Sequence, residues 1–231
     1  MDFTVELAGQ RLTMPIMNGA GSCKIIADVN ALARTPAGAI VVGSGTVKGG
    51  MGNANNTFDW NEYRSLNSLG LPNPGEEGYQ RDLPEMVNIA HEAGKLLYFS
   101  IAGNTQDEYA EMALTAADAK VDLIEINLGC PNKFDGDKRQ MRIIANLPDL
   151  SHEILYTIRR AIGLRLPISV KVTYYTTGAY SKKWRPSSIR AISWLALLSP
   201  PIRSRIAWPS PSMANICLCR SIRATPAEQV V

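Results

Sequence analysis

The side chains that bind zinc or build disulfide frameworks are scarce in this sequence of 231 residues. It contains two histidines and four cysteines, and Cys23, Cys130, Cys217 and Cys219 lack the paired spacing of zinc ligands or of a disulfide scaffold. No apolar run reaches the roughly 18 residues needed to cross a bilayer, and the N-terminal segment lacks the basic-then-apolar pattern of a signal peptide. These absences predict a soluble, cytoplasmic protein with no metal site and no membrane contact.

Glycine is absent from residues 181–231, which contain 9 serines, 6 prolines and a net charge of +7, whereas residues 1–180 carry −4. A basic tail can bind nucleic acid, and a divergent domain is another explanation. We favour a third interpretation, a shift of the reading frame. If residues 179–188 are back-translated with GC-rich codons and read two bases further on, they can encode the start of an amphipathic helix. The tail is then out of frame, and no nucleic-acid partner is expected.

Short β-rich runs alternate with helical segments up to about residue 178. The runs are almost continuously apolar, as expected for parallel strands covered on both faces. This alternation predicts an α/β fold with about five βα units, the first part of a (β/α)8 TIM barrel, and a doubly wound sheet is the alternative. We therefore predict a partial barrel over 1–178 and an irregular tail over 179–231, in which no sixth strand can be drawn from the pattern. The expected strands are 12–21, 39–46, 96–103, 122–129 and 168–175.

Two of the predicted helices have recognisable ends. Thr105 and Glu108 form a capping-box pattern, which predicts that a helix begins there. Ser151 is expected to open a second helix that closes at Gly163. This second segment has an apolar stripe at helical spacing, formed by Ile154, Leu155, Ile158 and Ile162.

Four asparagines lie in short motifs bounded by glycine or proline, namely Asn18, Asn67, Asn127 and Asn132. An amide both donates and accepts hydrogen bonds, so such a set suits a flat heterocycle whose edge alternates N–H and C=O groups. For any one asparagine the alternative is that it supports the backbone of its own turn.

Cys130 and Lys171 are the other two candidates for chemistry. Cys130 lies between a glycine and a proline, three residues beyond Asn127, where a thiol can act as a proton-abstracting base. The alternative is a half-buried small hydrophobic side chain. Lys171 lies inside the apolar run ISVKV, so it must either extend to solvent or meet a negative charge at the mouth of the barrel.

Four motifs, SLNSLGLPNPG, YFSIAG, INLGCPN and ISVKV, resemble the successive signatures of the dihydroorotate dehydrogenase family. They occur in the family's order and spacing, over about residues 1–178, and the cysteine of INLGCPN resembles the soluble class of the family. The resemblance implies an FMN-dependent (β/α)8 barrel that oxidises dihydroorotate to orotate in pyrimidine biosynthesis.

The resemblance also implies roles for individual residues around the cofactor FMN. Ala20 and Gly21 resemble the turn against which the flavin packs, and Asn127 would contact both cofactor and substrate. Lys171 resembles the lysine beside the N1/O2 edge of the flavin, where it would stabilise the reduced ring.

For the substrate, the resemblance implies that Asn67, Asn127 and Asn132 hold the carboxylate and the amide edge of the pyrimidine. Cys130 resembles the catalytic base that removes the C5 proton while hydride leaves C6 for the flavin. The implied partners are the substrate, a second copy of the chain or an iron–sulfur electron-transfer subunit, and the acceptor is fumarate or NAD.

Two departures from the family pattern keep other functions open. Gly43 in VVGSGT stands where the family commonly has a lysine, which favours another dihydropyrimidine as substrate. The glycine pairs that hold the FMN phosphate do not follow residue 178, so an inactive fragment is a further alternative.

Overall fold

A computed structural model describes residues 2–54, 56–130, 143–172, 192–195 and 216–218 of the chain. Its centre is a 7-stranded sheet with the strand order β10-β9-β8-β7-β4-β3-β11. Every neighbouring pair in this sheet is parallel except β11 and β3. The strands are β3 (Ile16–Asn18), β4 (Ala39–Gly45), β7 (Leu96–Ile101), β8 (Leu123–Asn127), β9 (Ile168–Lys171), β10 (Ile192–Leu195) and β11 (Ile216–Leu218).

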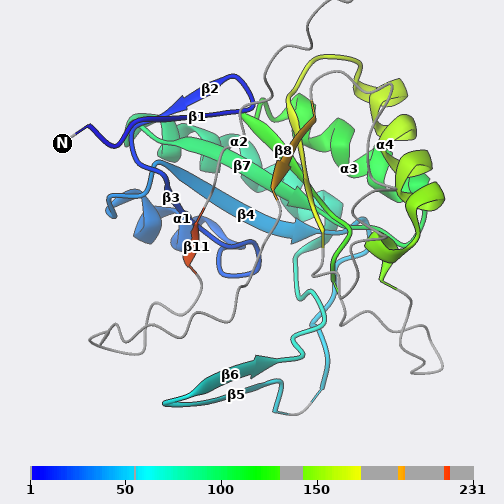
Figure 1. Cartoon of the computed structure of the whole chain (residues 1–231), viewed down its shortest axis with the longest axis horizontal. Helices are drawn as coiled ribbons and strands as arrows, with labels where there is room; N and C mark the ends of the chain where they lie inside the picture. The colour runs from blue at the N-terminus through cyan, green and yellow to red at the C-terminus, as the bar shows by residue number, and fades with distance from the viewer. Residues whose placement is uncertain (1, 55, 131–142, 173–191, 196–215, 219–231) are drawn as a thin grey trace, which may run out of the picture.

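The helices separate consecutive parallel strands of the sheet and pack on its outer face (Figure 1). This βα order is the predicted one, and the five predicted strand regions contain β3, β4, β7, β8 and β9. The helices are α1 (Ile26–Ala33), α2 (Gly75–Glu92), α3 (Gln106–Asp118) and α4 (Pro148–Ile162), with a 3₁₀ turn, η1 (Ile144–Asn146), before α4.

Helix α3 begins as its capping box predicted. The Thr105 side chain accepts a hydrogen bond from the Glu108 N–H at 3.2 Å, and the Asn104 N–H donates to Glu108 Oε2 at 2.6 Å. These bonds satisfy amide groups that the first turn of a helix leaves without an internal partner. The prediction for this helix start is confirmed.

Helix α4 begins three residues earlier than predicted, at Pro148. Proline suits the first turn of a helix because its missing N–H needs no partner there and its φ is already helical. Ser151 lies within the helix, where its buried hydroxyl bonds to the Ile144 and Leu147 carbonyl oxygens, each at 2.9 Å. The prediction that Ser151 opens the helix is therefore wrong, whereas Gly163 does close it.

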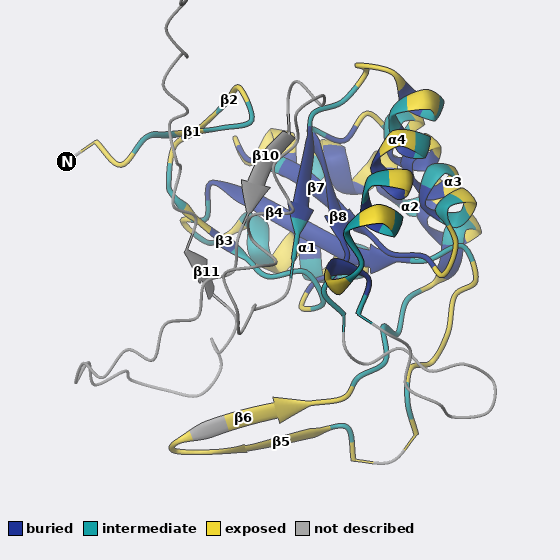
Figure 2. Ribbon diagram, turned by 45° about the vertical axis from the view of Figure 1, so that its right-hand side comes forward, coloured by how far each residue is buried: buried dark blue, intermediate teal, exposed yellow. Residues whose placement is uncertain are grey.

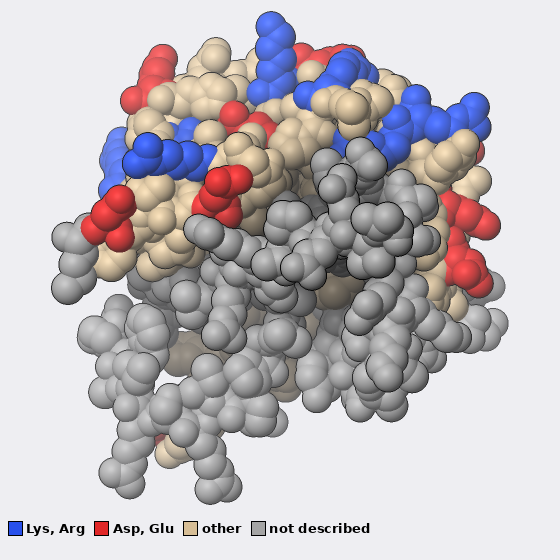
Figure 3. Space-filling model, turned by 45° about the horizontal axis from the view of Figure 1, so that its top comes forward, with Lys and Arg blue, Asp and Glu red and all other residues tan. Residues whose placement is uncertain are grey.

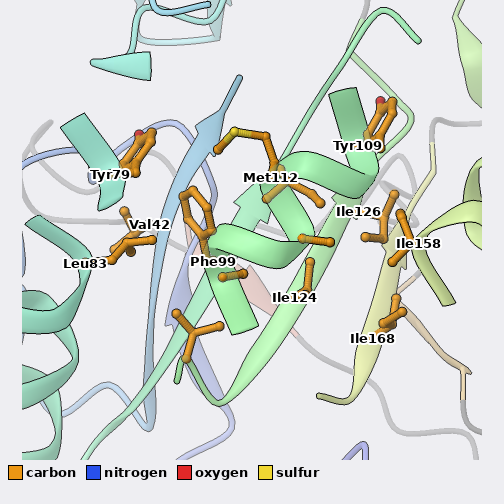
Figure 4. Packing of buried hydrophobic residues seen from close by; sticks show 14 of the residues in the cluster. Val42, Tyr79, Leu83, Phe99, Tyr109, Met112, Ile124, Ile126, Ile158 and Ile168 are labelled. Atoms are coloured by element: carbon orange, nitrogen blue, oxygen red, sulfur yellow. The ribbon is translucent and has the colours of Figure 1, made fainter. Parts of the chain in front are cut away.

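The outer face of the sheet and the helices enclose the larger apolar core. Tyr79 of α2 and Phe99 of β7 are both fully buried, with ring centroids 4.7 Å apart (Figure 4). Burial raises the pKa of the Cys23 thiol in this core to about 12. Residues from all four helices contribute, including Val29, Leu83, Met112 and Ile158.

The inner face of the sheet is apolar in its amino half. Tyr98 and Leu123 lie there in a second buried cluster with Met17, Ala39 and Val41. The antiparallel hairpin of β1 (Val5–Leu7) and β2 (Gln10–Leu12) contributes Leu12 to the same cluster. This hairpin, which was not predicted, covers the apolar amino half.

A second unpredicted hairpin consists of β5 (Phe58–Asn61) and β6 (Arg64–Asn67). It stands away from the sheet (Figure 1), and its strands are exposed along their length where burial is described (Figure 2). Phe58, Trp60 and Leu66 are at least half exposed.

The segment after residue 178 contributes two short strands to the sheet. β10 pairs in parallel with β9, and β11 pairs antiparallel with β3. No sixth strand could be drawn here from the sequence, because Ile192–Leu195 is a short run with no helix pattern around it to mark it as part of a βα unit.

Within the described residues, no helix combines the length and the apolar composition needed to cross a membrane. On the described part of the face in Figure 3, basic and acidic side chains are interspersed, and neither sign forms a continuous patch there.

Candidate functional site

The carboxyl half of the inner face is polar, in contrast to its amino half. Side chains two residues apart on a strand lie on the same face, so Ser100 follows Tyr98 on β7, and Glu125 follows Leu123 on β8. These polar side chains are buried, with Ser100 fully inaccessible and Glu125 5% exposed. The ends of parallel strands are the usual position of a ligand site in this architecture.

A chain of hydrogen bonds, here called the inner polar network, joins β9, β8, β7 and β4. Lys171 Nζ and Ser100 Oγ both donate to Glu125 Oε1, at 2.6 and 2.8 Å. Ser44 Oγ lies 2.8 Å from Ser100 Oγ, and Asn127 Nδ2 donates to Ser44 Oγ at 2.8 Å. The network therefore consists of Lys171, Glu125, Ser100, Ser44 and Asn127.

Proton counting fixes the direction of each bond in the network. Ser100 has one hydroxyl proton and donates it to Glu125. The bond between the two serines must therefore use the proton of Ser44, which in turn accepts from the Asn127 amide. Asn127 thus donates to Ser44, Ser44 to Ser100 and Ser100 to Glu125. The carboxylate receives both this chain and the lysine.

The pair of Lys171 and Glu125 is almost removed from solvent, with side chains 14% and 6% exposed. Burying a charge is costly unless it is paired and hydrogen-bonded, and here the carboxylate accepts two bonds. Of the two alternatives for Lys171, extension to solvent or a negatively charged partner, the structure shows the second. Sequence reasoning missed Glu125, Ser100 and Ser44, although a glutamate inside the apolar run LIEIN is the same signal as the lysine in ISVKV.

Cys130 lies in the loop that follows β8 and is half-buried. The start of this loop is held by three hydrogen bonds. The Tyr109 hydroxyl of α3 donates to the Asn127 carbonyl oxygen at 2.8 Å, the Leu128 N–H donates to the Lys171 carbonyl oxygen at 3.0 Å, and the Gly129 N–H donates to Asn127 Oδ1 at 3.3 Å. Burial raises the pKa of Tyr109 far above its ordinary value, so this hydroxyl is a neutral donor.

The turn at Ala20 and Gly21 follows β3 at the same end of the sheet. The Gly21 N–H donates to the Gly43 carbonyl oxygen at 2.6 Å, and the Gly43 N–H donates to the Cys23 carbonyl oxygen at 2.9 Å. A Cβ at Gly21, whose φ is +103°, would meet no atom within 4 Å. The turn therefore has a bare backbone surface with open space beside it, which suits the close approach of a flat ring.

Gly43 has no room for a side chain. A Cβ there would lie 2.3 Å from the Ser100 carbonyl oxygen, and its φ of +108° disfavours other residues. The backbone conformation of β4 therefore excludes a lysine at this position. A lysine could be accommodated only with a different conformation of this strand.

The asparagines predicted from the sequence lie in different parts of the molecule. Asn127 lies opposite Lys171 in the register of β8 and β9. Asn18 donates to the Val41 carbonyl oxygen at 2.7 Å and accepts from its N–H at 2.8 Å, so it joins β3 to β4 as backbone support. Asn67 ends β6 on the projecting hairpin, paired with Phe58, and Asn132 lies outside the described residues.

The site therefore brings together an ammonium group, an amide, a thiol-bearing loop and an open glycine turn at one end of a parallel sheet. An ammonium and an amide suit the polar edge of a heterocyclic cofactor, and the turn suits its face, so these residues fit a flavin. Within the described residues, no group of three or more His, Cys, Asp or Glu side chains could hold a metal ion.

A curled parallel β/α sheet with its polar groups at the strand ends defines the class as the ligand-binding β/α barrels. The family model for dihydroorotate dehydrogenase matches residues 2–181. The chain belongs to the dihydroorotate dehydrogenase family, which confirms the resemblance seen in its motifs.

Individual relatives show the extent of the similarity. The chain is 28% identical over 185 residues to a probable dihydroorotate dehydrogenase A (fumarate) of Enterococcus faecalis, covering 76% of this chain and 56% of that protein. It is 31% identical over 180 residues to the catalytic subunit of dihydroorotate dehydrogenase B (NAD(+)) of Alkaliphilus metalliredigens, covering 75% and 55%. The chain thus spans about half the length of the curated relatives it matches.

The fold is also similar to a solved structure, that of a dihydroorotate dehydrogenase from Eimeria tenella in complex with ferulenol. The TM-score is 0.64 at 17% identity, over 79% of this chain and 55% of that chain. This similarity confirms the predicted fold class, an incomplete (β/α)8 barrel.

Proposed function

We propose that the chain carries part of the active site of an FMN-dependent oxidoreductase that oxidises dihydroorotate to orotate in pyrimidine biosynthesis, in the cytoplasm. The observation that carries the proposal is the inner polar network, which places Lys171 and Asn127 side by side at the carboxyl end of the sheet in a chain of this family.

Cys130 is the proposed catalytic base. The C5–H of dihydroorotate lies next to a carbonyl and is weakly acidic, so a thiolate can remove this proton. FMN, held by Ala20, Gly21, Asn127 and Lys171, would supply the acceptor for the hydride that leaves C6, so that loss of the proton and the hydride together gives orotate. The loop from Asn127 to Cys130 supports this role, because its hydrogen bonds to α3 and β9 fix its start next to Lys171.

The remaining site residues bind and orient. Ala20 and Gly21 would contact the flat face of FMN, and Lys171 and Asn127 its polar edge. Asn67, Asn127 and Asn132 would hold the substrate carboxylate and amide edge. Of the three N–H groups of the Lys171 ammonium, the described structure uses one, toward Glu125, which leaves donors for a ligand.

The two kinds of relative support two alternatives for the electron acceptor and the partner. One is named for fumarate and the other is a catalytic subunit named for NAD(+). We propose that the chain forms a homodimer with fumarate as acceptor or pairs with an iron–sulfur electron-transfer subunit that passes electrons to NAD.

Anaerobic flavin bleaching tests the proposal. The full chain, loaded with FMN, is mixed with dihydroorotate, and loss of flavin absorbance is followed together with orotate formation. Cys130→Ala is expected to bind FMN but to bleach at least about 10²-fold more slowly, since a general base contributes about 10²–10⁴-fold. Cys23→Ala is the matched control, because this thiol is fully buried in the outer core, and it should bleach at the parent rate.

Two results would contradict the assignment. If the parent chain binds no FMN, the proposed cofactor is wrong. If Cys130→Ala bleaches as fast as the parent, the base lies elsewhere.

A second candidate is the oxidation of another dihydropyrimidine. The observation in its favour is Gly43, where the backbone of β4 leaves no space for the lysine common in the family. Dihydrouracil, which lacks the carboxylate, is a suitable probe in the same bleaching experiment. Faster bleaching by dihydrouracil than by dihydroorotate would favour this candidate.

A further inference from the structure

We propose that Glu125 is the positioning residue of the site. It fixes the Lys171 ammonium, and the two serines of the inner polar network connect it to the Asn127 amide and the Cys130 loop, so that these groups keep a fixed position relative to the ammonium. The inference rests on the proposed function, because it assigns how that site is held in its working geometry. Glu125 itself is assigned no contact with substrate or cofactor.

A lysine side chain is mobile unless another group holds it. It has a flexible four-carbon stem and a compact charge that any acceptor can attract, so a lysine at the end of a strand is not placed by its own backbone. Glu125 lies on the neighbouring strand, two residues before the level of Lys171 in the register Glu125↔Ser169, Asn127↔Lys171. Its carboxylate reaches Lys171 Nζ at 2.6 Å from a side chain that is 6% exposed.

The Glu125 carboxylate is itself held by hydrogen bonds. Ser100 donates to the same oxygen that receives the lysine, and Ser44 donates to Ser100. Charged groups make stronger hydrogen bonds than neutral ones, and a buried chain whose bonds all point toward the carboxylate stabilises its negative charge. Glu125 is therefore a fixed point to which the more flexible lysine is attached.

The end of the inner polar network farthest from Lys171 reaches the Cys130 loop. Asn127 donates its amide to Ser44, which leaves its Oδ1 to accept the Gly129 N–H at 3.3 Å. Gly129 immediately precedes Cys130. One chain of hydrogen bonds thus fixes the positions of three groups. They are the ammonium proposed to face the cofactor, the amide beside it and the start of the loop that carries the proposed base.

The first test needs no cofactor. The full chain without flavin is treated with formaldehyde and a borane reductant, and the methylation rate of each lysine is read by mass spectrometry. In Glu125→Gln, Lys171 is expected to react about tenfold faster or more, because the amine no longer has a carboxylate to hold it. Lys95 is the internal control, since it is buried and donates to the Thr35 and Ala37 carbonyl oxygens at 2.6 and 2.8 Å.

The outcomes of this test separate positioning from folding. Acceleration of Lys171 with an unchanged Lys95 supports the inference, and an unchanged Lys171 overturns it. If both lysines accelerate, the glutamine variant has lost its fold, and Glu125→Asp, which keeps the charge on a shorter side chain, replaces it. Selective acceleration of Lys171 in that variant supports the inference, and any other pattern overturns it.

The second test measures the midpoint potential of bound FMN in the parent, Glu125→Gln and Ser169→Ala. Removing a negative charge from beside the ammonium should move the potential to a more positive value, whereas the inner-face control Ser169→Ala should leave it unchanged. A potential in Glu125→Gln equal to that of the parent overturns the inference. If the parent binds no FMN, the proposed function fails, and the methylation rates alone decide the role of Glu125.

Discussion

The two halves of the inner face of the sheet differ although they belong to the same strands. In the amino half, Tyr98 and Leu123 pack in an apolar cluster under the β1–β2 hairpin. Two residues further along the same strands, Ser100 and Glu125 belong to the inner polar network. The change from apolar to polar marks the boundary between the part of the face that stabilises the fold and the part that we propose as the site.

The energetic contributions of the two halves also differ. Burying apolar surface contributes about 25 cal/mol per Å², so the amino half stabilises the sheet directly. A buried ion pair loses about as much in desolvation as it gains in attraction, and apolar residues of similar volume often serve stability as well or better. The pair of Glu125 and Lys171 is therefore poorly explained by stability and well explained by a site.

The largest expected effect comes from breaking the ion pair. Lys171→Met leaves Glu125 buried and unpaired, which should lower the free energy of unfolding by about 3–5 kcal/mol. The double variant Glu125→Leu/Lys171→Met should recover most of this loss, or exceed the parent, because no buried charge remains. Urea denaturation followed by far-UV circular dichroism measures both. A double variant as unstable as Lys171→Met would mean that the polar half stabilises the fold as such.

In the amino half, Leu123→Ala should lower the free energy of unfolding by about 2–5 kcal/mol, since it removes buried methyl groups and leaves a cavity. No second substitution with a polar residue should restore it. The same urea denaturation measures the loss. A loss below about 1 kcal/mol would show that the β1–β2 hairpin can collapse into the space.

Alkaline pH should weaken the outer core through Cys23. Its pKa is about 12 in the folded protein against 9.0 for the unperturbed thiol, so above pH 9 the unfolded state loses its proton first. The free energy of unfolding should therefore fall as the pH rises from 9 toward 12, by about 2 kcal/mol from this thiol at pH 10.5.

Cys23→Ala isolates this contribution, because Tyr79 in the same core also has a pKa raised by burial. Urea midpoints at pH 8 and pH 10.5 should decline less in the variant than in the parent. Equal declines would show that the thiol does not contribute.

The smallest expected effect belongs to Ser100→Ala. The variant removes one donor to Glu125 and one acceptor for Ser44, and the expected loss is about 1.5 kcal/mol, where the range for neutral hydrogen bonds meets that for bonds to a charged group. Denaturation in urea measures it beside Ser169→Ala, the neighbouring inner-face serine. A loss above that of Leu123→Ala would reverse the comparison between the two halves.

Much of the fold could be predicted because its signals are local. The apolar runs that became β4, β7, β8 and β9 and the capping box at Thr105 are each contained in a few consecutive residues. The predicted start of α4 was wrong, because serine is a residue type common at helix caps. In the folded chain the Ser151 hydroxyl bonds instead to a carbonyl oxygen of the preceding 3₁₀ turn, which the sequence pattern does not reveal. The boundary at residue 178, the frame of the tail and the role of Asn132 stay predictions.

The sequence by itself determined the alternation of strands and helices, the family motifs, and the choice for Lys171 between solvent and a negative partner. Only the tertiary structure decided that this partner is Glu125, 46 residues away, and that Ser44 and Ser100 connect it to Asn127. The physical reason is that the register between parallel strands sets which side chains meet, and a shift of one residue would turn every side chain to the other face. The periodicity of apolar residues and the composition are properties of consecutive residues, whereas the strand register results from the packing of the whole sheet.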